Sequence, residues 1–505
     1  MGAVHIIMSP PCNRVSPKHV LSVDVTRKMM MYILFFFIIA FSCAVDCSVL
    51  DNEVHDTNDV TCAVPETLRQ EIKNYEPVVN KIIDSIVYGR FRGRTWRTLA
   101  YFVDKFGSRI AGSENLENAI DFMLNQSSQF GLENVHGEKA VVPHWVRGNE
   151  SAVLVSPRIQ KLPMLGLGSS VGTPPEGIKA EVLVVTSFDE LQEKASLVPG
   201  KIVVFNEPFK SYGETVQYRT QGASKAARLG AVATLIRSVT PFSLATPHTG
   251  QQDYADNVTH IPTACITVED AEMLHRMAKR GDKLVIHLKM EAHTLKPATS
   301  RNTIAEIVGS SEPEKVVVVS GHLDSWDVGQ GAMDDGGGAF ISWNTLVILK
   351  KLGLRPRRTI RCILWTAEEE GLIGAQAYVK AHKNETRNLD YVMESDEGTF
   401  LPMGLSFSGS EKAGCILQEV LKLFKPIGAS RYSTPQVGGS DIALWTDVGV
   451  PSSSLINANE HYFWFHHTAA DMVTVEDPHV LDLCTAIWTA AAYVVADLSA
   501  DIPRD

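Results

Sequence analysis

The 505-residue sequence predicts an α/β protein whose main domain is a doubly wound, mixed sheet. Between residue 296 and the C-terminus, apolar stretches typical of strands alternate with stretches typical of helices. Alternation of this kind predicts parallel strands with helices packed on both faces. Four of the expected strands lead, at their C-terminal ends, to acidic residues or histidines. Because open α/β sheets bind ligands beyond the carboxyl ends of their strands, we expect one shared site there.

The four expected strands are short and apolar, which is typical of buried strands. They span residues 316–319, 359–366, 389–393 and 449–456. The expected helices of the same domain span residues 341–352, 371–382, 413–423 and 485–498. Nearer the N-terminus, the spacing of apolar residues predicts helices over residues 65–88 and 117–130, with Gly131 ending the second.

The residues that follow the four strands are of the types that bind divalent metals. They are His322, Asp324, Asp334 and Asp335, then Glu368, Glu369 and Glu370, then Glu394 and Asp396, then His466, His467 and Asp471. Taken singly, an acidic residue after a strand is commonly a helix cap or a solvated loop residue. Four strand ends that all carry such residues are harder to explain in this way, because carboxylates that converge without a cation repel each other strongly. The sequence therefore predicts a metal site.

These same stretches resemble a known family, the aminopeptidase-type dizinc metallopeptidases. The similar motifs are Gly-His-Leu-Asp-Ser-Trp-Asp at 321–327, Gly-Ala-Met-Asp-Asp-Gly-Gly-Gly at 331–338, Trp-Thr-Ala-Glu-Glu at 365–369, Glu-Ser-Asp at 394–396 and His-His-Thr at 466–468. The resemblance covers nearly all of the chain after about residue 65. It implies two Zn²⁺ ions per subunit and a homodimer, although histidine with carboxylates also suits cobalt or manganese.

The resemblance also implies a role for each residue. One zinc would be held by His322 and Asp396, the other by Glu369 and His467, with Asp334 as the bridge. Glu368 would be the general base that takes a proton from the attacking water and returns it to the leaving amine. The family pattern favours His467 over His466, which is expected to pack nearby. Asp324 and Asp335 are expected to orient the ligands, as is Asp471, unless they are simply solvated.

The expected function is that of a zinc-dependent exopeptidase of carboxypeptidase type, acting on dipeptides or short peptides with free termini. An aminopeptidase of the same family is the first alternative, and an inactive peptide-binding or receptor protein is the second. The presence of the full set of ligands and of Glu368 favours an enzyme. The loop 438–442 resembles a substrate-lining loop whose free amides would accept a carboxylate, unless Ser440 is a plain N-cap. The aromatic residues 462–465 wall a pocket or belong to the core.

The chain divides into five expected segments. Residues 1–45 form a signal peptide, unless the apolar run 31–45 is an uncleaved anchor. Residues 46–64 form an acidic leader or a zymogen propeptide, and residues 65–150 the first part of the peptidase domain. Residues 151–295 have short β-branched strands and resemble an inserted protease-associated domain, which is either a lid or a structural insertion. Residues 296–505 complete the peptidase domain and carry the metal site.

The leader predicts a secreted protein that passes through the endoplasmic reticulum and Golgi, with the lysosome as a further destination. Four sequons fit this route as glycosylation sites: Asn125, Asn149, Asn257 and Asn384. The net charge of −11 argues against nucleic acid, and no membrane is expected after leader cleavage. Cys12 and Cys43 leave with the leader, and the scattered Cys47, Cys62, Cys265, Cys362, Cys415 and Cys484 predict no disulfide framework.

Overall fold

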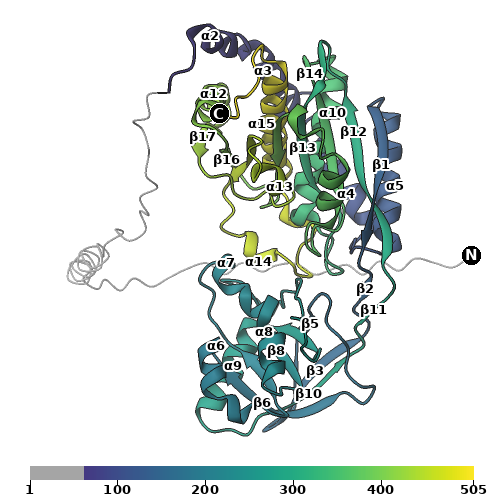
Figure 1. The fold of residues 1–505 in the computed structure, drawn as a ribbon, viewed down its shortest axis with the longest axis vertical. Helices are drawn as coiled ribbons and strands as arrows, with labels where there is room; N and C mark the ends of the chain where they lie inside the picture. The colour runs from purple at the N-terminus through teal and green to yellow at the C-terminus, as the bar shows by residue number, and fades with distance from the viewer. Residues whose placement is uncertain (1–61) are drawn as a thin grey trace, which may run out of the picture. The chain divides into compact units, whose positions relative to one another are not determined.

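The computed structural model of the protein describes residues 62–505 (Figure 1). The expected signal peptide and nearly all of the expected leader lie outside the described residues, as do Cys12, Cys43 and Cys47. The described chain contains two eight-stranded sheets and a small two-stranded one.

The first large sheet has the strand order β1-β12-β14-β13-β15-β18-β16-β17. These strands are, in that order, Glu133–Val142, Ala298–Ile307, Arg358–Trp365, Glu312–His322, Leu389–Glu394, Ser452–Asn457, Pro402–Ser408 and Arg431–Ser433. The four central strands β14, β13, β15 and β18 are parallel to their neighbours in this group, whereas β1, β12 and β16 add antiparallel pairs. The predicted mixed α/β sheet is therefore confirmed.

Helices cover both faces of this sheet. Alternate residues of β13 point to opposite faces and therefore pack against different helices. Val317 and Val319 pack in a core formed with α10 (Gly337–Leu352), α15 (Pro478–Asp497), α4 (Arg94–Phe106) and α5 (Glu114–Gln129). Val316 and Val318 pack in a separate core with α11 (Ile373–Ala381) and α13 (Ala443–Thr446). β13 is thus buried on both faces, which explains its continuous apolar run.

The expected helix over residues 65–88 is divided into three parts. They are α2 (Glu66–Asn74), α3 (Glu76–Ile83) and a π-helical turn, Asp84–Tyr88. The break at Tyr75 has a local cause, because Pro77 lies in the first turn of α3 and cannot donate a helical hydrogen bond.

The second large sheet is built from residues 150–290, which are called the insert below. Its order is β4-β3-β10-β6-β7-β8-β9-β5, with strands Gln160–Leu162, Glu150–Ser156, Val285–Met290, Ile178–Val185, Ile202–Phe205, Ala233–Arg237, Thr263–Ile266 and Met164–Gly166. Its helices include α7 (Tyr212–Thr215), α8 (Gln217–Arg228) and α9 (Val268–Lys279). The chain enters and leaves the insert beside the paired strands β2 (Trp145–Val146) and β11 (His293–Thr294).

One disulfide joins Cys62 to Cys415, across 353 residues of sequence. The expectation that no disulfide forms is therefore wrong. The positions of the cysteines in the sequence did not indicate this pair, because only the fold places the start of α2 beside α12 (Glu411–Leu421). Cys362 is a buried free thiol, as predicted, and so are Cys265 and Cys484.

Candidate metal centre

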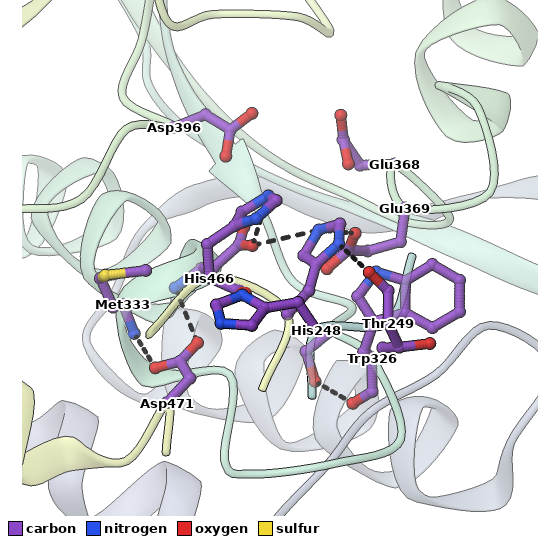
Figure 2. Close-up of polar contacts among 12 residues, drawn as sticks. His248, Thr249, Trp326, Met333, Glu368, Glu369, Asp396, His466 and Asp471 are labelled. Carbon is purple, nitrogen blue, oxygen red and sulfur yellow. Dashed lines mark hydrogen bonds and ion pairs between the residues drawn. The ribbon is translucent and has the colours of Figure 1, made fainter. Parts of the chain in front are cut away.

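The carboxyl ends of the parallel strands bring the predicted ligands together. His322 is the last residue of β13, and its Nε2 atom lies 3.3 Å from Asp334 Oδ1 and 3.4 Å from Asp396 Oδ1. Asp334 lies in the turn Ala332–Gly336, where its own backbone is not helical (φ −120°, ψ 91°), and Asp396 follows β15. Figure 2 shows the side chains of Asp396, Glu368 and Glu369 pointing toward the histidine rings.

A second group forms on the other oxygen of Asp334. His467 Nε2 lies 3.4 Å from Asp334 Oδ2 and 2.9 Å from Glu369 Oε2. Asp334 therefore faces a histidine and a second carboxylate on each side. Its Oδ2 atom is buried and has no hydrogen-bond partner in residues 62–505. A buried carboxylate oxygen without a donor fits a bound cation.

The two histidines present the atom that a metal needs. Asp324 O lies 3.0 Å from His322 Nδ1, and Thr249 O lies 3.2 Å from His467 Nδ1. A carbonyl oxygen accepts only, so each Nδ1 carries the proton and each Nε2 turns a lone pair to the site. This arrangement is the usual support of a metal-binding histidine.

Charge in the site also favours a cation. Burial opposes a charge on His322, but the neighbouring Asp334 and Asp396 carboxylates outweigh burial and raise the pKa of this ring. Burial, followed by the nearby Asp334 carboxylate, raises the pKa of Glu369 well above its ordinary value. A divalent cation between these groups would relieve the repulsion and stabilise the carboxylates. The residues present therefore fit a metal.

Three further aspartates hold the loops in place. The Asp324 carboxylate accepts hydrogen bonds from the backbone N–H groups of Glu368 (3.2 Å) and Glu369 (3.3 Å). Its expected contact with His322 is made by the backbone carbonyl instead, since the carboxylate lies 3.7 Å from Nδ1. Asp335 accepts from the N–H of His322 and of Gly338, and thus ties β13 to the start of α10.

Asp471 supports the turn that carries the bridging residue. Its carboxylate accepts hydrogen bonds from three consecutive N–H groups, those of Ala332, Met333 and Asp334, at 3.0, 2.8 and 3.1 Å, and Figure 2 shows the bond from Met333. The predicted supporting positions are therefore buried and bonded rather than solvated.

His466 lies against the ring of its neighbour, as expected. The two rings are stacked with centroids 3.5 Å apart. His466 Nε2 also lies 3.6 Å from Asp334 Oδ2, so this ring reaches the edge of the second group. His467 is the better-placed ligand of the two, because it alone also contacts Glu369.

Glu368 has the position expected of a base. Ser440 Oγ donates a hydrogen bond to Glu368 Oε1 at 2.7 Å, and Glu368 Oε2 lies 3.9 Å from His322 Nε2. Burial, with Asp396 close by, raises the pKa of Glu368 to about 8. Ser440 is not a helix N-cap, since Ile442 precedes the four-residue α13, and the N–H of Ile442 is already bonded to Glu394. The hypothesis of a carboxylate-binding helix start is therefore not supported.

These groups line a pocket of about 580 Å³. The predicted loop contributes Gly438, Gly439 and Ser440, and the aromatic run contributes Tyr462 and Phe463. The insert adds Tyr212, Arg219 and Gln251, which the sequence analysis missed. No local pattern marked them, because they lie 70 or more residues before the first metal motif and belong to the insert rather than to the first sheet.

Known proteins resemble this chain over most of its length. The model of peptidase family M28 matches residues 302–492. Carboxypeptidase Q of Homo sapiens is 55% identical over 447 residues, which cover 88% of this chain and 94% of the human protein. The Mus musculus carboxypeptidase Q is also 55% identical, over 88% of this chain and 95% of its own.

Solved structures of peptidases have the same fold as this chain. A peptidase M28 precursor from Shewanella amazonensis SB2B superposes with a TM-score of 0.82 at 31% identity, covering 86% of this chain and 99% of its own. A zinc aminopeptidase from Bacillus subtilis shares the fold, with a TM-score of 0.63 at 21% identity over 82% of this chain and 99% of its own.

The sheet, the clustered metal-binding residues and the M28 match define the class, that of M28-type peptidases. At 55% identity over nearly the full length of its relatives, the chain belongs to the carboxypeptidase Q family within that class. The resemblance noted in the sequence motifs is thereby confirmed.

Proposed function

We propose that the protein is a zinc-dependent exopeptidase that removes C-terminal residues from dipeptides and short peptides. The observation that carries the carboxypeptidase assignment is Arg219, a buried cation of α8 that lines the pocket beside the second metal group. Membership in the carboxypeptidase Q family supports the same assignment.

Arg219 has no acidic partner within residues 62–505. Its Nη2 donates to Tyr212 Oη at 2.7 Å, its Nη1 lies 3.4 Å from Thr249 O, and its Nε is buried without a partner. The His467 Nδ1 atom, 3.5 Å away, is already a donor to Thr249 O and cannot accept from Arg219. A buried guanidinium without a counter-ion is costly, and the free carboxylate of a substrate would neutralise it.

The proposed reaction uses the geometry described above. Two zinc ions, one held by His322 and Asp396, the other by Glu369 and His467, and both by Asp334, would supply Lewis acidity to water and to the peptide carbonyl. Glu368, fixed by Ser440, accepts the proton of the attacking water and then donates it to the leaving amine nitrogen. Arg219 holds the C-terminal carboxylate, so that the last peptide bond is the one presented to Glu368.

Further features of the protein belong to the same proposal. The insert acts as a protease-associated-type lid, supported by its contribution of Arg219 and Tyr212 to the pocket. The protein is secreted or lysosomal, glycosylated and homodimeric. The expected leader supports export, and Asn125, Asn149, Asn257 and Asn384 are all exposed.

Cleavage of end-blocked peptides tests the assignment. With zinc present, we expect dipeptides and tripeptides with an acetylated N-terminus to be cleaved and those with an amidated C-terminus to resist, and a chelator should abolish cleavage. Arg219→Ala should raise KM for free-acid substrates about 10–100-fold, the loss expected for a charge-assisted hydrogen bond. Arg228→Ala, at an exposed position of the same helix, is the matched control.

The alternatives give different results. Cleavage of amides with rejection of acetylated peptides would indicate an aminopeptidase, and a requirement for both free ends would indicate a dipeptidase. Failure to cleave any peptide with metal bound would indicate a binding protein.

A further inference from the structure

The insert forms hydrogen bonds along the loop that carries the metal-binding histidine. In this loop, residues 462–468, the carbonyls of Phe463, His466 and His467 each accept from the insert. The donors are Thr240 Oγ1, His248 Nδ1 at 2.8 Å and the Thr249 backbone N–H at 2.9 Å, respectively. The histidine loop follows β18 of the first sheet, but its backbone is hydrogen-bonded to the insert.

Thr249 and His467 are joined twice. The Thr249 N–H donates to the His467 carbonyl, and the His467 ring Nδ1–H donates back to the Thr249 carbonyl at 3.2 Å. This pair fixes both the tautomer and the direction of the imidazole. It also fixes the backbone of His467, whose φ of +60° lies in a left-handed region that is sterically disfavoured for non-glycine residues.

His248 and Thr249 are themselves held firmly by the insert. The His248 N–H donates to Ser238 Oγ at 2.9 Å, and Thr249 Oγ1 donates to the carbonyl of Gly166 in β5 at 2.7 Å. Both residues are buried. The Thr249 carbonyl is therefore held in a fixed position, where it accepts the hydrogen bond of the His467 ring.

The first metal group has no such dependence. The Nδ1 partner of His322 is Asp324 O, two residues along the same loop, and the backbone N–H of His322 is bonded to Asp335. Among residues 62–505, the insert therefore supplies the Nδ1 partner of only one of the two ligand histidines. A change at His248 or Thr249 should therefore act on the group that contains His467 and spare the group that contains His322.

We propose that His248 and Thr249 make the insert a structural part of the metal centre. They position His467 and so set the cation affinity of the group formed by Glu369, His467 and Asp334. In this role His248 is a positioning residue, acting through the His466 carbonyl. The inference rests on the zinc binding proposed above.

Zinc titration of the full-length mature protein against a competing chelator tests the inference. The wild type should bind two zinc ions, and His248→Ala should weaken one of them about 10–100-fold while changing the other less than twofold. His248→Asn should restore the affinity, because the Asn Nδ2 atom occupies the position of His Nδ1 and donates to the same carbonyl. His260→Ala, an exposed histidine of the insert, is the matched control and should bind as the wild type does.

The outcomes are separable. Equal weakening of both ions, or no change in either, would overturn the inference while leaving the proposed function intact. Absence of zinc binding in the wild type would contradict the proposed function itself. If His248→Ala does not fold, Thr240→Val removes the bond to the Phe463 carbonyl and carries the same expectation of one weakened ion.

Discussion

Glu368 and Glu369 are adjacent in the chain, yet their carboxylates have different partners. Glu368 Oε1 accepts from Ser440, whereas Glu369 Oε2 lies 2.9 Å from His467 Nε2. Ala367, just before them, has a left-handed φ of 54°, and the Asp324 carboxylate holds both following N–H groups. The sharp turn after β14 thus separates the carboxylate proposed to bind metal from the one proposed to transfer a proton.

Glu368→Gln should therefore remove proton transfer without disturbing the metal ligands. We expect kcat to fall about 10²–10⁴-fold, the usual contribution of a general base, with zinc content unchanged. Steady-state kinetics and metal analysis measure the two quantities. Glu370→Gln is the neighbouring control, since Glu370 does not line the pocket. Full hydrolysis by Glu368→Gln would refute the assigned role.

Glu476 gives a prediction for pH. Burial raises the pKa of this carboxyl from 4.5 to about 8, and Thr399 Oγ1 donates to it at 2.7 Å. The folded protein therefore retains a proton that the unfolded chain loses above pH 4.5. This stabilisation is complete below pH 4.5 and is lost as the pH rises through about 8.

Glu476→Gln should remove that part of the pH dependence. Urea unfolding should be measured at pH 5 and at pH 8. Between these two values, the free energy of unfolding of the wild type should fall by on the order of 1–4 kcal/mol more than that of the variant. Glu314→Gln, at an exposed position, should behave as the wild type does. Identical pH profiles for wild type and Glu476→Gln would show that Glu476 does not titrate in this range.

At the scale of elements, the disulfide ties the start of the described chain to α12, 353 residues further along the sequence. Cys62 precedes α2, and Cys415 lies in α12, which also packs against α2. The bond closes a loop of most of the described chain, and long closed loops restrict the unfolded state most strongly.

Cys62→Ser should lower the free energy of unfolding by about 2–5 kcal/mol while leaving kcat near its wild-type value. Thermal unfolding measures the first effect, and a thiol reagent should detect Cys415 as a new free thiol. Since the metal site lies at the strand ends rather than at α12, a large loss of activity in the folded variant would contradict this separation.

At the scale of the whole molecule, the insert is joined to the first sheet by a charged pair. Arg147, after β2, binds both carboxylate oxygens of Asp327, which lies in the loop after β13. Arg147 also donates to the Gly166 carbonyl of β5. One largely buried guanidinium therefore connects the metal-site loop to the insert.

Arg147→Ala should destabilise the protein by about 3–5 kcal/mol, because it leaves Asp327 without its partner. The double variant Arg147→Met with Asp327→Leu should be less affected, since Asp327 is no longer left unpaired and only Glu150, whose Oε1 lies 3.4 Å from Arg147 Nη1, loses a charged partner. Chemical denaturation compares the three proteins. Equal destabilisation of the single and double variants would show that packing, rather than charge pairing, joins the parts.

The sequence by itself determined the sheet and the residues that gather at its edge. Short uninterrupted β-branched runs favour buried strands, and ligand-type residues at the carboxyl ends of parallel strands are brought close because those ends share one edge. His322, Asp334, Glu368, Glu369, Asp396 and His467 were all identified in this way, with the roles supplied by the resemblance.

The tertiary structure alone decided the contacts between distant segments. The Cys62–Cys415 bond, the supply of Arg219 to the pocket and the pairing of Thr249 with His467 join residues more than 200 positions apart. Local propensity and motif spacing carry no information about such pairs, because they depend on how two sheets pack. The choice between the carbonyl and the carboxylate of Asp324 as the partner of His322 likewise required the folded loop.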